Sequence, residues 1–287
     1  MKVLVTGACG QLGTALRQIA PEGWLFTDIA DGFPHLDITD SDAVRSFVAE
    51  HGVDAIVNCA GYTNVEAAED NQEAAMLLNG TAPGILASAI KERGGLIVHI
   101  STDYVFDGKG PQVPIREDAK PAPLSVYGQS KLKGEEAVLA SGADSIIFRT
   151  AWLYSPWGKN FVKTIIGLTS SRDSIKVVSD QFGTPTYAPD LAAVILVALE
   201  KYASGAPCLG VFNYTDEGVA TWYDFALEIA RQSGNTSCAV TPCKTGEFPT
   251  KAARPAWSVL DKTLVKRTFG VSIPSWEESL AICMSNM

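Results

Sequence analysis

The amino-terminal stretch places the strongest constraint on how this chain folds. Residues 2–6 form a short apolar run rich in β-branched side chains, which is typical of a buried strand. Gly7, Gly10 and Gly13 follow at once, and residues 14–19 have helical spacing. This order suits a dinucleotide pyrophosphate, because bare backbone can approach it and the helix amino terminus offers free N–H groups. A plain strand-to-helix turn is the alternative, but it would not need three glycines in phase.

Strand and helix patterns alternate after this unit. The apolar runs that predict further parallel strands lie at 24–27, 53–60, 96–100 and 145–150. From residue 151 the alternation becomes irregular. We therefore predict an α/β fold with a Rossmann-type doubly wound parallel sheet over residues 1–150. A smaller mixed α/β substrate-binding domain should occupy most of 151–287, with segments near 175–203 returning to the first domain.

Local signals set several helix boundaries. A helical stretch over about 65–91 should be interrupted at Pro83, which lacks the N–H that a helix needs. Thr39 or Ser41 is expected to cap the helix before the third strand, and Asp190 to cap the apolar helix that follows it. Asn79 could bond the backbone of a neighbouring segment or join a proton relay, and the first interpretation is favoured.

The ends of the second and third strands add candidate cofactor contacts. Asp28 ends the second strand, where a carboxylate can accept hydrogen bonds from the adenine-side ribose and would repel a 2′-phosphate. That position favours NADH, although an exposed turn residue is the alternative. In this layout Asp37 and Ile38 fall where an adenine would lie. The small-residue stretch Ala60-Gly61-Tyr62 would let a nicotinamide ribose sit close to the backbone.

Tyr127 and Lys131 are spaced to share one face of a helix. An ammonium beside a phenol favours the phenolate and lowers the tyrosine pKa from its ordinary value of about 10, so Tyr127 could donate a proton to a developing alkoxide. Thr102 leaves the carboxyl end of a strand and faces the same crevice as the glycine turn. Chance explains a Tyr-x-x-x-Lys spacing taken alone. Together these residues predict hydride transfer at a carbon that bears oxygen, with Lys131 holding the nicotinamide ribose.

Composition excludes several other classes of function. The formal net charge of −9 argues against a nucleic-acid binder, which needs a clustered basic face. No apolar run reaches the ~18 residues that span a bilayer. The six cysteines are scattered without a CxxC pair, and the three histidines are isolated, so we expect reduced thiols and no metal site. These features predict a cytoplasmic protein.

Three motifs carry a resemblance to a known superfamily. They are TGACGQLG at 6–13, STDYVFDG at 101–108 and YGQSK at 127–131. With them the chain resembles the extended short-chain dehydrogenase/reductases, and the pieces RTAWLY at 149–154 and DQFGTPT at 180–186 are similar to those of the dTDP-4-dehydrorhamnose reductases. The resemblance implies that NADPH or NADH reduces the 4-keto group of dTDP-4-dehydro-L-rhamnose, a nucleotide sugar, to give dTDP-L-rhamnose for cell-surface polysaccharide.

The resemblance also implies roles for individual residues. Tyr127 would be the proton donor, Lys131 its partner and Thr102 a tuning hydroxyl. The cofactor contacts would be Gly10, Gln11 and Leu12 at the pyrophosphate, Asp28, Asp37 and Ile38 at the adenosine, and Ala60, Gly61 and Tyr62 at the nicotinamide. Asp103 and Trp152 would contact the sugar nucleotide, and Arg254 would pair with its diphosphate.

Two departures from related patterns narrow the prediction. Sugar-nucleotide 4,6-dehydratases carry an Asp-Glu pair after the threonine, whereas Asp103 is followed here by Tyr104, so dehydration is not expected. Some rhamnose-pathway reductases pair through magnesium held by a glutamate in the helix after the glycine turn. That helix begins here with Thr14-Ala15, which favours a monomer or weak homodimer over a metal-bridged dimer.

Two rival functions stay open at the level of sequence. The first rival is a regulatory subunit like the β subunit of methionine adenosyltransferase, which is similar to these reductases and binds a nicotinamide cofactor. Intact Thr102, Tyr127, Lys131 and Trp152 favour an enzyme over such a subunit. The second rival is a reductase or epimerase that acts on another nucleotide sugar.

Overall fold

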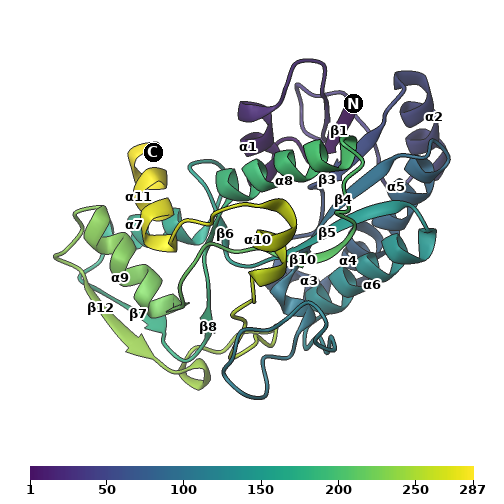
Figure 1. The fold of residues 1–287 in the computed structure, drawn as a ribbon. Coiled ribbons are helices and arrows are strands. Elements are labelled where there is room, and N and C mark those ends of the chain that lie inside the picture. The colour runs from purple at the N-terminus through teal and green to yellow at the C-terminus, as the bar shows by residue number, and fades with distance from the viewer.

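Short runs of aliphatic residues form a six-stranded parallel sheet at the centre of the structure, a computed structural model that describes residues 1–287 (Figure 1). Its strands are β1 (Val3–Thr6), β2 (Leu25–Thr27), β3 (Ala55–Asn58), β4 (Leu96–Thr102), β5 (Asp144–Thr150) and β10 (Gly210–Asn213). They lie in the order β10-β5-β4-β3-β1-β2, so the direction of winding reverses between β1 and β3. The predicted Rossmann-type doubly wound sheet is confirmed.

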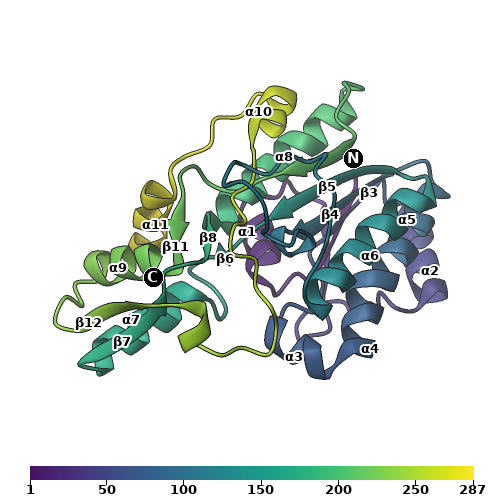
Figure 2. The same cartoon turned by 90° about the horizontal axis from the view of Figure 1, so that it is seen from below.

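Amphipathic helices cover both faces of this sheet (Figure 2). One face packs against α1 (Gln11–Ile19), α8 (Ala188–Ala203) and α10 (Thr263–Phe269) around a core of 23 buried residues. The other face packs against α2 (Ser41–His51), α5 (Ala82–Lys91) and α6 (Val126–Ser141) around a core of 15. Strands covered on both faces read as continuous apolar runs, which is why the sequence signalled them clearly.

A separate apolar cluster of 14 buried residues lies beyond one edge of the central layers, towards the carboxyl-terminal end of the chain (Figure 1). Its elements are α7 (Phe161–Ser171), β7 (Ser174–Val178), α9 (Trp222–Gln232), β12 (Ala239–Cys243) and α11 (Trp276–Ser285). Two short strand pairs join this region to the central layers: β6 (Leu153–Tyr154) with β9 (Thr186–Tyr187), and β8 (Phe182–Gly183) with β11 (Ala220–Thr221). The domain boundary at residue 150 stays a prediction.

The helical stretch after β3 corrects one prediction. Helices α3 (Val65–Asp70) and α4 (Gln72–Ala75) meet at Asn71, and a π-helical segment, η1 (Met76–Thr81), leads directly into α5. Pro83 does not interrupt the helix, because it lies in the first turn of α5, where a missing N–H costs little. The irregularity falls instead at Asn71 and in the π-helical segment.

Two predicted helix caps are also wrong. Asp40 caps α2 by accepting from the N–H groups of Asp42 and Ala43, so neither Thr39 nor Ser41 has that role. Helix α8 begins at Ala188 rather than after Asp190, and the Asp190 carboxylate accepts from Ser279 of α11 instead. The remaining short turns are η2 (Asp103–Val105) and η3 (Thr245–Glu247). None of the helices combines the length and the apolar character that crossing a bilayer demands.

Candidate active site

A cavity of about 770 Å³ lies at the carboxyl ends of the central strands, where the winding reverses. Open α/β sheets bind their ligands at this position. The structure brings 16 of the 17 predicted site residues to the wall of this one cavity. They are Gly7, Gly10, Gln11, Leu12, Asp28, Asp37, Ile38, Ala60, Gly61, Tyr62, Thr102, Asp103, Tyr127, Lys131, Trp152 and Arg254. Gly13 does not line it.

The glycine turn has the geometry of an anion cradle. A Cβ at Gly7, whose φ is +70°, would lie 2.6 Å from the backbone nitrogen of Ala60, and a Cβ at Gly13 would lie 2.2 Å from the carbonyl oxygen of Gly7. Gly13 therefore serves the packing of α1 against the turn. Helix α1 has no side-chain cap at Gly10, so its first N–H groups stay free for a ligand. This cradle fits a cofactor diphosphate.

Asp28 and Asp37 both brace backbone at the predicted adenosine end of the cavity. The Asp28 carboxylate accepts from the N–H groups of Cys9, at 2.8 Å, and Ala30, at 3.0 Å. One carboxylate oxygen of Asp37 accepts from the N–H and the hydroxyl of Thr39. A carboxylate has about four acceptor positions, so Asp28 keeps capacity for a ribose hydroxyl while it holds the glycine turn.

Gln11 connects the glycine turn to the loop that follows β6. Its amide donates to the Leu153 carbonyl at 3.2 Å, and its amide oxygen accepts from Ser155 at 2.9 Å and Asn160 at 2.8 Å. This loop also brings the exposed cation of Lys159 to the cavity wall. Lys159 was not predicted as a site residue, because the local pattern around a loop lysine does not indicate the contacts that Gln11 makes with this loop.

Asn79 fixes the backbone on the predicted nicotinamide side. Its amide oxygen accepts from the Tyr62 N–H at 2.8 Å, and its amide nitrogen donates to the Tyr62 carbonyl at 2.9 Å and to Ser130 at 3.0 Å. Ser130 in turn donates to the Tyr127 carbonyl. The favoured interpretation of Asn79 as a backbone-bonding residue therefore agrees with its contacts, which join the loop after β3 to α6.

Thr102, Tyr127 and Lys131 all line this cavity. Burial raises the pKa of Tyr127 to about 12, and the nearby Thr102 side chain acts in the opposite direction. Burial also lowers the pKa of Lys131 to about 8. Near neutral pH the phenol therefore carries its proton and the amine is largely charged, which are the states that a proton donor and a cationic partner need.

The expectation that Lys131 lowers the pKa of Tyr127 is wrong for this geometry. The Lys131 ammonium donates to the Ile100 carbonyl at 2.5 Å, and the side chain is 7% exposed. Its charge is therefore directed at strand β4, and desolvation decides the acidity of the phenol. A shared helix face brings two side chains near one another, but it does not determine where the ammonium points.

Asp103 is a buried carboxyl group close to Thr102 and Tyr127. It is 1% exposed, and one oxygen accepts from the Thr102 hydroxyl at 3.1 Å. Burial raises the pKa of Asp103 to about 6, against hydrogen bonds that lower it. The carboxylate directs the Thr102 hydroxyl, whose oxygen also accepts from the Tyr104 N–H at 3.3 Å.

Two stacked indoles line the cavity at the boundary with the carboxyl-terminal cluster. Trp152 has a φ of 49°, a backbone conformation that costs energy for a bulky residue and often occurs at functional sites. Its ring stacks on Trp222 of α9 with centroids 3.7 Å apart and an interplanar angle of 14°. Trp222 was not predicted as a site residue; it is the first residue of α9, whose amino terminus has a capping box formed by Thr221 and Asp224.

Arg254 reaches the cavity already paired with an acidic side chain. Its guanidinium donates to Glu66 of α3 at 2.9 Å, and Lys251 nearby pairs with Asp70 of the same helix. Although burial opposes the effect, the bond from Arg254 holds the pKa of Glu66 below its usual value. Arg254 keeps further N–H groups for an anionic ligand, because Glu66 occupies one nitrogen of the guanidinium.

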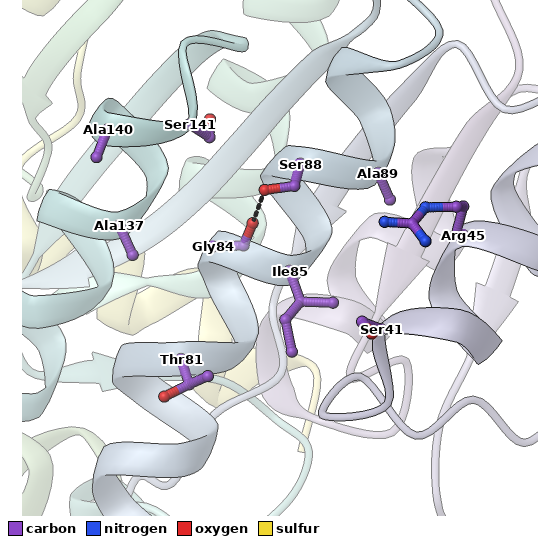
Figure 3. Close-up of a pocket in the computed structure, with 10 residues that line it drawn as sticks. All are labelled: Ser41, Arg45, Thr81, Gly84, Ile85, Ser88, Ala89, Ala137, Ala140 and Ser141. Carbon is purple, nitrogen blue, oxygen red and sulfur yellow. Dashed lines mark hydrogen bonds between the residues drawn. The ribbon is translucent and has the colours of Figure 1, made fainter.

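A second hollow lies between the helices α2, α5 and α6, which cover one face of the central sheet (Figure 3). Its volume is about 480 Å³, and small side chains such as Thr81, Ser88 and Ala137 line it. Arg45 provides the charge there, and exposed Asp42 and Glu92 already neutralise it. No acid–base pair or nucleophile converges in this hollow, so the chemistry belongs to the larger cavity.

Comparisons with known proteins agree with this architecture. A family model described as "RmlD substrate binding domain" matches residues 1–287. A dTDP-4-dehydrorhamnose reductase of Burkholderia thailandensis is 39% identical over 299 residues, covering 100% of this chain and 99% of that protein. The solved structure of a dTDP-4-dehydrorhamnose reductase of Clostridium acetobutylicum is 42% identical in sequence and has a TM-score of 0.92. The match covers 100% of this chain and 99% of that chain. Another from Bacillus anthracis, in complex with NADP, is 36% identical with a TM-score of 0.91, covering 100% of both chains.

Proposed function

The chain belongs to the RmlD substrate-binding-domain family, whose relatives described above are dTDP-4-dehydrorhamnose reductases, and from this we propose that it reduces the 4-keto group of dTDP-4-dehydro-L-rhamnose. The reductant is NADPH or NADH, and the product, dTDP-L-rhamnose, enters cell-surface polysaccharide synthesis. One observation carries the proposal: the glycine cradle and the Thr102–Tyr127–Lys131 group line the same cavity. Neither feature alone would distinguish a reductase from a cofactor-binding scaffold.

The residues of the chain divide the work along the cavity. The first N–H groups of α1 and the backbone at Gly10 hold the cofactor diphosphate, while Lys131 holds the nicotinamide ribose. A bound reduced nicotinamide supplies the hydride. Tyr127 donates its phenolic proton to the carbonyl oxygen as negative charge develops there, and the Thr102 hydroxyl turns from Asp103 to donate to the same oxygen. The protonated phenol suits this direction of transfer, because burial keeps the pKa of Tyr127 near 12.

The remaining wall residues recognise the sugar nucleotide. Asp103 and Trp152 contact the sugar, and Arg254 pairs with the diphosphate. Lys159 is an additional cation within the same cavity. These assignments rest on the convergence of apolar, acceptor and cationic groups beyond the donor pair, an arrangement that matches a sugar carrying a diphosphate.

The direct test is turnover with the purified protein. NADH and NADPH are supplied separately with dTDP-4-dehydro-L-rhamnose, and the fall in absorbance of the reduced nicotinamide is followed. We expect consumption of cofactor and formation of dTDP-L-rhamnose. Absence of turnover above the blank with both cofactors would reject the proposed reaction, and comparison of the two cofactors measures the preference that Asp28 predicts.

Tyr127→Phe tests the proposed proton donor. The variant keeps the ring and removes the hydroxyl, so cofactor affinity should persist while kcat falls by about 100- to 10,000-fold, the usual worth of a positioned acid. Steady-state kinetics and fluorescence titration of NADH measure the two quantities. Wild-type turnover in this variant would assign the proton to another group.

Two alternatives predict different outcomes in the same assays. A regulatory subunit similar to the methionine adenosyltransferase β subunit would bind the nicotinamide cofactor without reducing any sugar nucleotide. A reductase of another nucleotide sugar would be inactive on the rhamnose precursor and active on a different member of a substrate panel. The assembled donor group favours an enzyme over the regulatory subunit.

We also propose a monomer or weak homodimer that works in the cytoplasm without a metal ion. No three or more His, Cys, Asp and Glu side chains are grouped so that they could hold a metal, and the six cysteines are free thiols. A chelator should therefore change neither turnover nor the molar mass measured by light scattering. Loss of a dimer on chelation would contradict this proposal.

A further inference from the structure

A buried ion pair lies directly behind the catalytic group. Arg149 of β5 donates to both carboxylate oxygens of Glu135 in α6, with distances of 2.9 Å from Nε and 2.7 Å from Nη2. The side chains are 5% and 3% exposed, and neither lines the cavity. The Ser101 hydroxyl donates to the same carboxylate. Glu135 is thus almost completely buried and lies outside the cavity lining.

The Glu135 carboxylate connects α6, which carries Tyr127 and Lys131, to β4, which carries Thr102. Glu135 lies one helical turn after Lys131, which follows Tyr127 by one turn on the same helix. Ser101 lies in β4 between Ile100, whose carbonyl accepts from Lys131, and Thr102. A single acceptor therefore fixes the position of α6 along β4.

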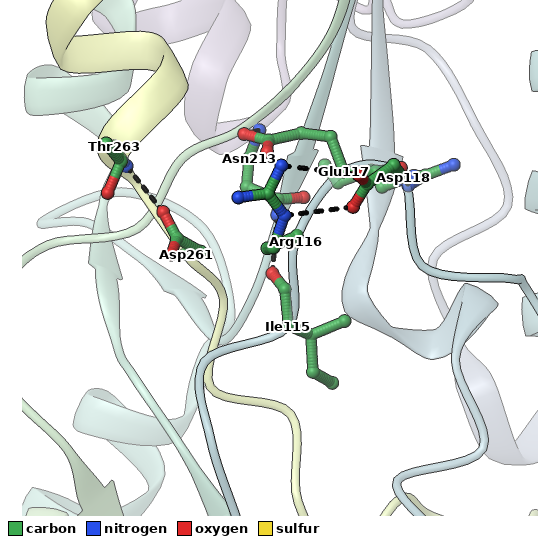
Figure 4. Close-up of polar contacts among 8 residues, drawn as sticks. Ile115, Arg116, Glu117, Asp118, Asn213, Asp261 and Thr263 are labelled. Carbon is green, nitrogen blue, oxygen red and sulfur yellow. Dashed lines mark hydrogen bonds and ion pairs between the residues drawn. The ribbon is translucent and has the colours of Figure 1, made fainter.

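Arg149 connects this group of hydrogen bonds, through Glu117, to the end of strand β10. Its Nη1 donates to the Glu117 carbonyl at 3.0 Å. The Glu117 carboxylate accepts from the Asn213 N–H at the end of β10, and the Asn213 amide donates to the Ile115 carbonyl (Figure 4). The carboxyl edge of the sheet beneath the cavity is held by this continuous set of polar contacts.

The same carboxylate determines the charge balance around Lys131. The ionisable groups that face Lys131 are Glu135 on α6, Cys59 after β3 and His99 on β4. Burial raises the pKa of Cys59 to about 12 and lowers the pKa of His99 well below its usual value, so both are uncharged near neutral pH. Desolvation lowers the pKa of Lys131 to about 8, and the negative charge of Glu135 opposes that effect.

We propose that Glu135 is a positioning residue for the reductase reaction. Its negative charge keeps the ammonium of Lys131 charged, and its bonds to Ser101 and Arg149 keep Lys131 in register with Thr102. The inference rests on the proposed roles of Tyr127 and Lys131. A buried Arg–Glu pair is a weak source of stability, because well-packed apolar side chains often replace such a pair without loss. A role in holding the catalytic elements accounts for a pair at this particular place.

Glu135→Gln is the first test, and Glu136→Gln is its matched control. Glu136 is the next residue of α6, lies 58% exposed and pairs only with Lys133 at the surface. The control should keep wild-type kinetics. Glu135→Gln should lower kcat by roughly 100-fold, the cost of a displacement near 1 Å, with little change in the KM for the sugar nucleotide. Wild-type kcat in Glu135→Gln would overturn the proposal.

The pH dependence separates the electrostatic part from the geometric part. Cofactor binding that needs charged Lys131 should weaken as the pH rises through about 8 in the wild type. Without the carboxylate this midpoint should fall by about one unit or more, since an adjacent opposite charge is worth about 1 to 3 units. Fluorescence titration of NADH and NADPH between pH 6 and 9 measures the midpoint and needs no sugar substrate. An unchanged midpoint would overturn the proposal.

A double variant addresses unfolding of the single one. Glu135→Gln leaves Arg149 buried without a counter-charge, which destabilises the fold. Glu135→Gln with Arg149→Met removes both charges, and chemical denaturation should show stability returning towards wild type. The low kcat and the lowered midpoint should nevertheless persist. If kcat and the pH midpoint of cofactor binding both returned to wild type together with stability, the pair would have only a structural role and the proposal would be overturned.

These readouts distinguish failure of this inference from failure of the proposed function. If the wild-type protein oxidised no cofactor with any nucleotide sugar, the proposed function would fall, yet the cofactor-binding midpoint of Glu135→Gln would still test the link to Lys131. If turnover occurred and the midpoint did not move, the function would stand and the role of Glu135 would fall.

Discussion

Burial controls the protonation of the residues around Tyr127. It raises the pKa of Tyr127 to about 12 and that of Asp103 to about 6, and it lowers the pKa of Lys131 to about 8. Each shift disfavours the charged form of the group, as expected in a poorly hydrated wall. The site therefore stores a proton on the phenol and keeps an ionised carboxylate beside it only at a cost in folding free energy.

Asp103→Asn should make the protein more stable at neutral pH. The folded pKa of Asp103, about 6, lies above its unfolded value of 3.8, so the folded protein binds more protons between these two values and loses stability as the pH rises through them. Asparagine can still accept from Thr102 and removes this penalty. We expect a gain of up to about 3 kcal/mol at pH 7 and none near pH 3.8.

Urea denaturation at the two pH values measures this difference, and turnover at pH 7 provides the companion measurement. A gain in stability together with a loss of rate would identify Asp103 as a residue retained for function at the expense of stability. Equal stability of both proteins at pH 7 would show that the carboxylate is better solvated than its burial indicates.

The convergence of the candidate catalytic residues on one cavity was predictable, but their protonation was not. Tyr127, Lys131 and Thr102 were recognisable from spacing, because helical period and strand ends determine which side chains share a crevice. The acidity of Tyr127 was mispredicted because it depends on desolvation and on the direction of the Lys131 ammonium. Both are properties of tertiary packing, which residue spacing does not contain.

At the scale of elements, the segment around Asn79 shows how packing overrides local rules. The sequence predicted a break at Pro83, whereas the chain continues through a π-helical segment into α5. A Cβ at Gly134 of α6 would lie 2.1 Å from the Asn79 carbonyl oxygen, so the two helical stretches approach very closely. A π-helical turn often marks a functional site, and here it directs Asn79 at the loop after β3.

Asn79→Ala should loosen that loop and weaken cofactor binding. The change removes two hydrogen bonds to the backbone of Tyr62 and one to Ser130, and buried groups left without partners cost about 1–3 kcal/mol each. We expect lower stability and a reduced affinity for NADH in fluorescence titration. Asn71→Ala on the same helical stretch is the control, since exposed Asn71 bonds only within its own turn and should bind the cofactor normally. Equal affinity in both variants would contradict this role.

Element types were predicted more reliably than their ends. The parallel strands were recognised because both faces are buried and their runs are continuously apolar. The amino-terminal cap of α2 was misassigned because Thr39, Asp40 and Ser41 are all good capping residues and are adjacent in sequence. Asp190 was misassigned because its carboxylate bonds Ser279, which lies 89 residues away in the chain.

At the scale of the whole molecule, the cavity joins residues from distant parts of the chain. Trp152 follows the last strand of the continuous sheet pattern, and Trp222 comes from the carboxyl-terminal cluster, yet their rings stack. The contact depends on how two apolar clusters meet, so no local pattern could have predicted Trp222. The resemblance to known reductases supplied Trp152 and Arg254, whose positions were likewise outside the reach of spacing arguments.

The segment 251–254 crosses from the carboxyl-terminal part of the chain to α3. The backbone N–H of Lys251 donates to Glu66 at 2.8 Å, the Lys251 side chain pairs with Asp70, and Arg254 donates to the other oxygen of Glu66. One carboxylate thus receives both ends of the segment. The Glu66 carboxylate holds Arg254 at the cavity wall. Because Glu66 carries a negative charge, as a phosphate does, this contact preorganises the guanidinium for an anionic ligand.

Arg254→Ala should raise KM for the sugar nucleotide by about 10- to 100-fold, because a hydrogen bond to a charged group is worth about 1.5–3 kcal/mol. The affinity for NADH should stay unchanged, since the cofactor cradle lies at the glycine turn. Lys251→Ala is the matched control: its side chain is 63% exposed, and a surface pair contributes at most about 1 kcal/mol. Calorimetric titration with dTDP checks the diphosphate contact without turnover. If Arg254→Ala bound dTDP as tightly as the control did, the diphosphate would have to lie elsewhere, with Lys159 the next cation to replace.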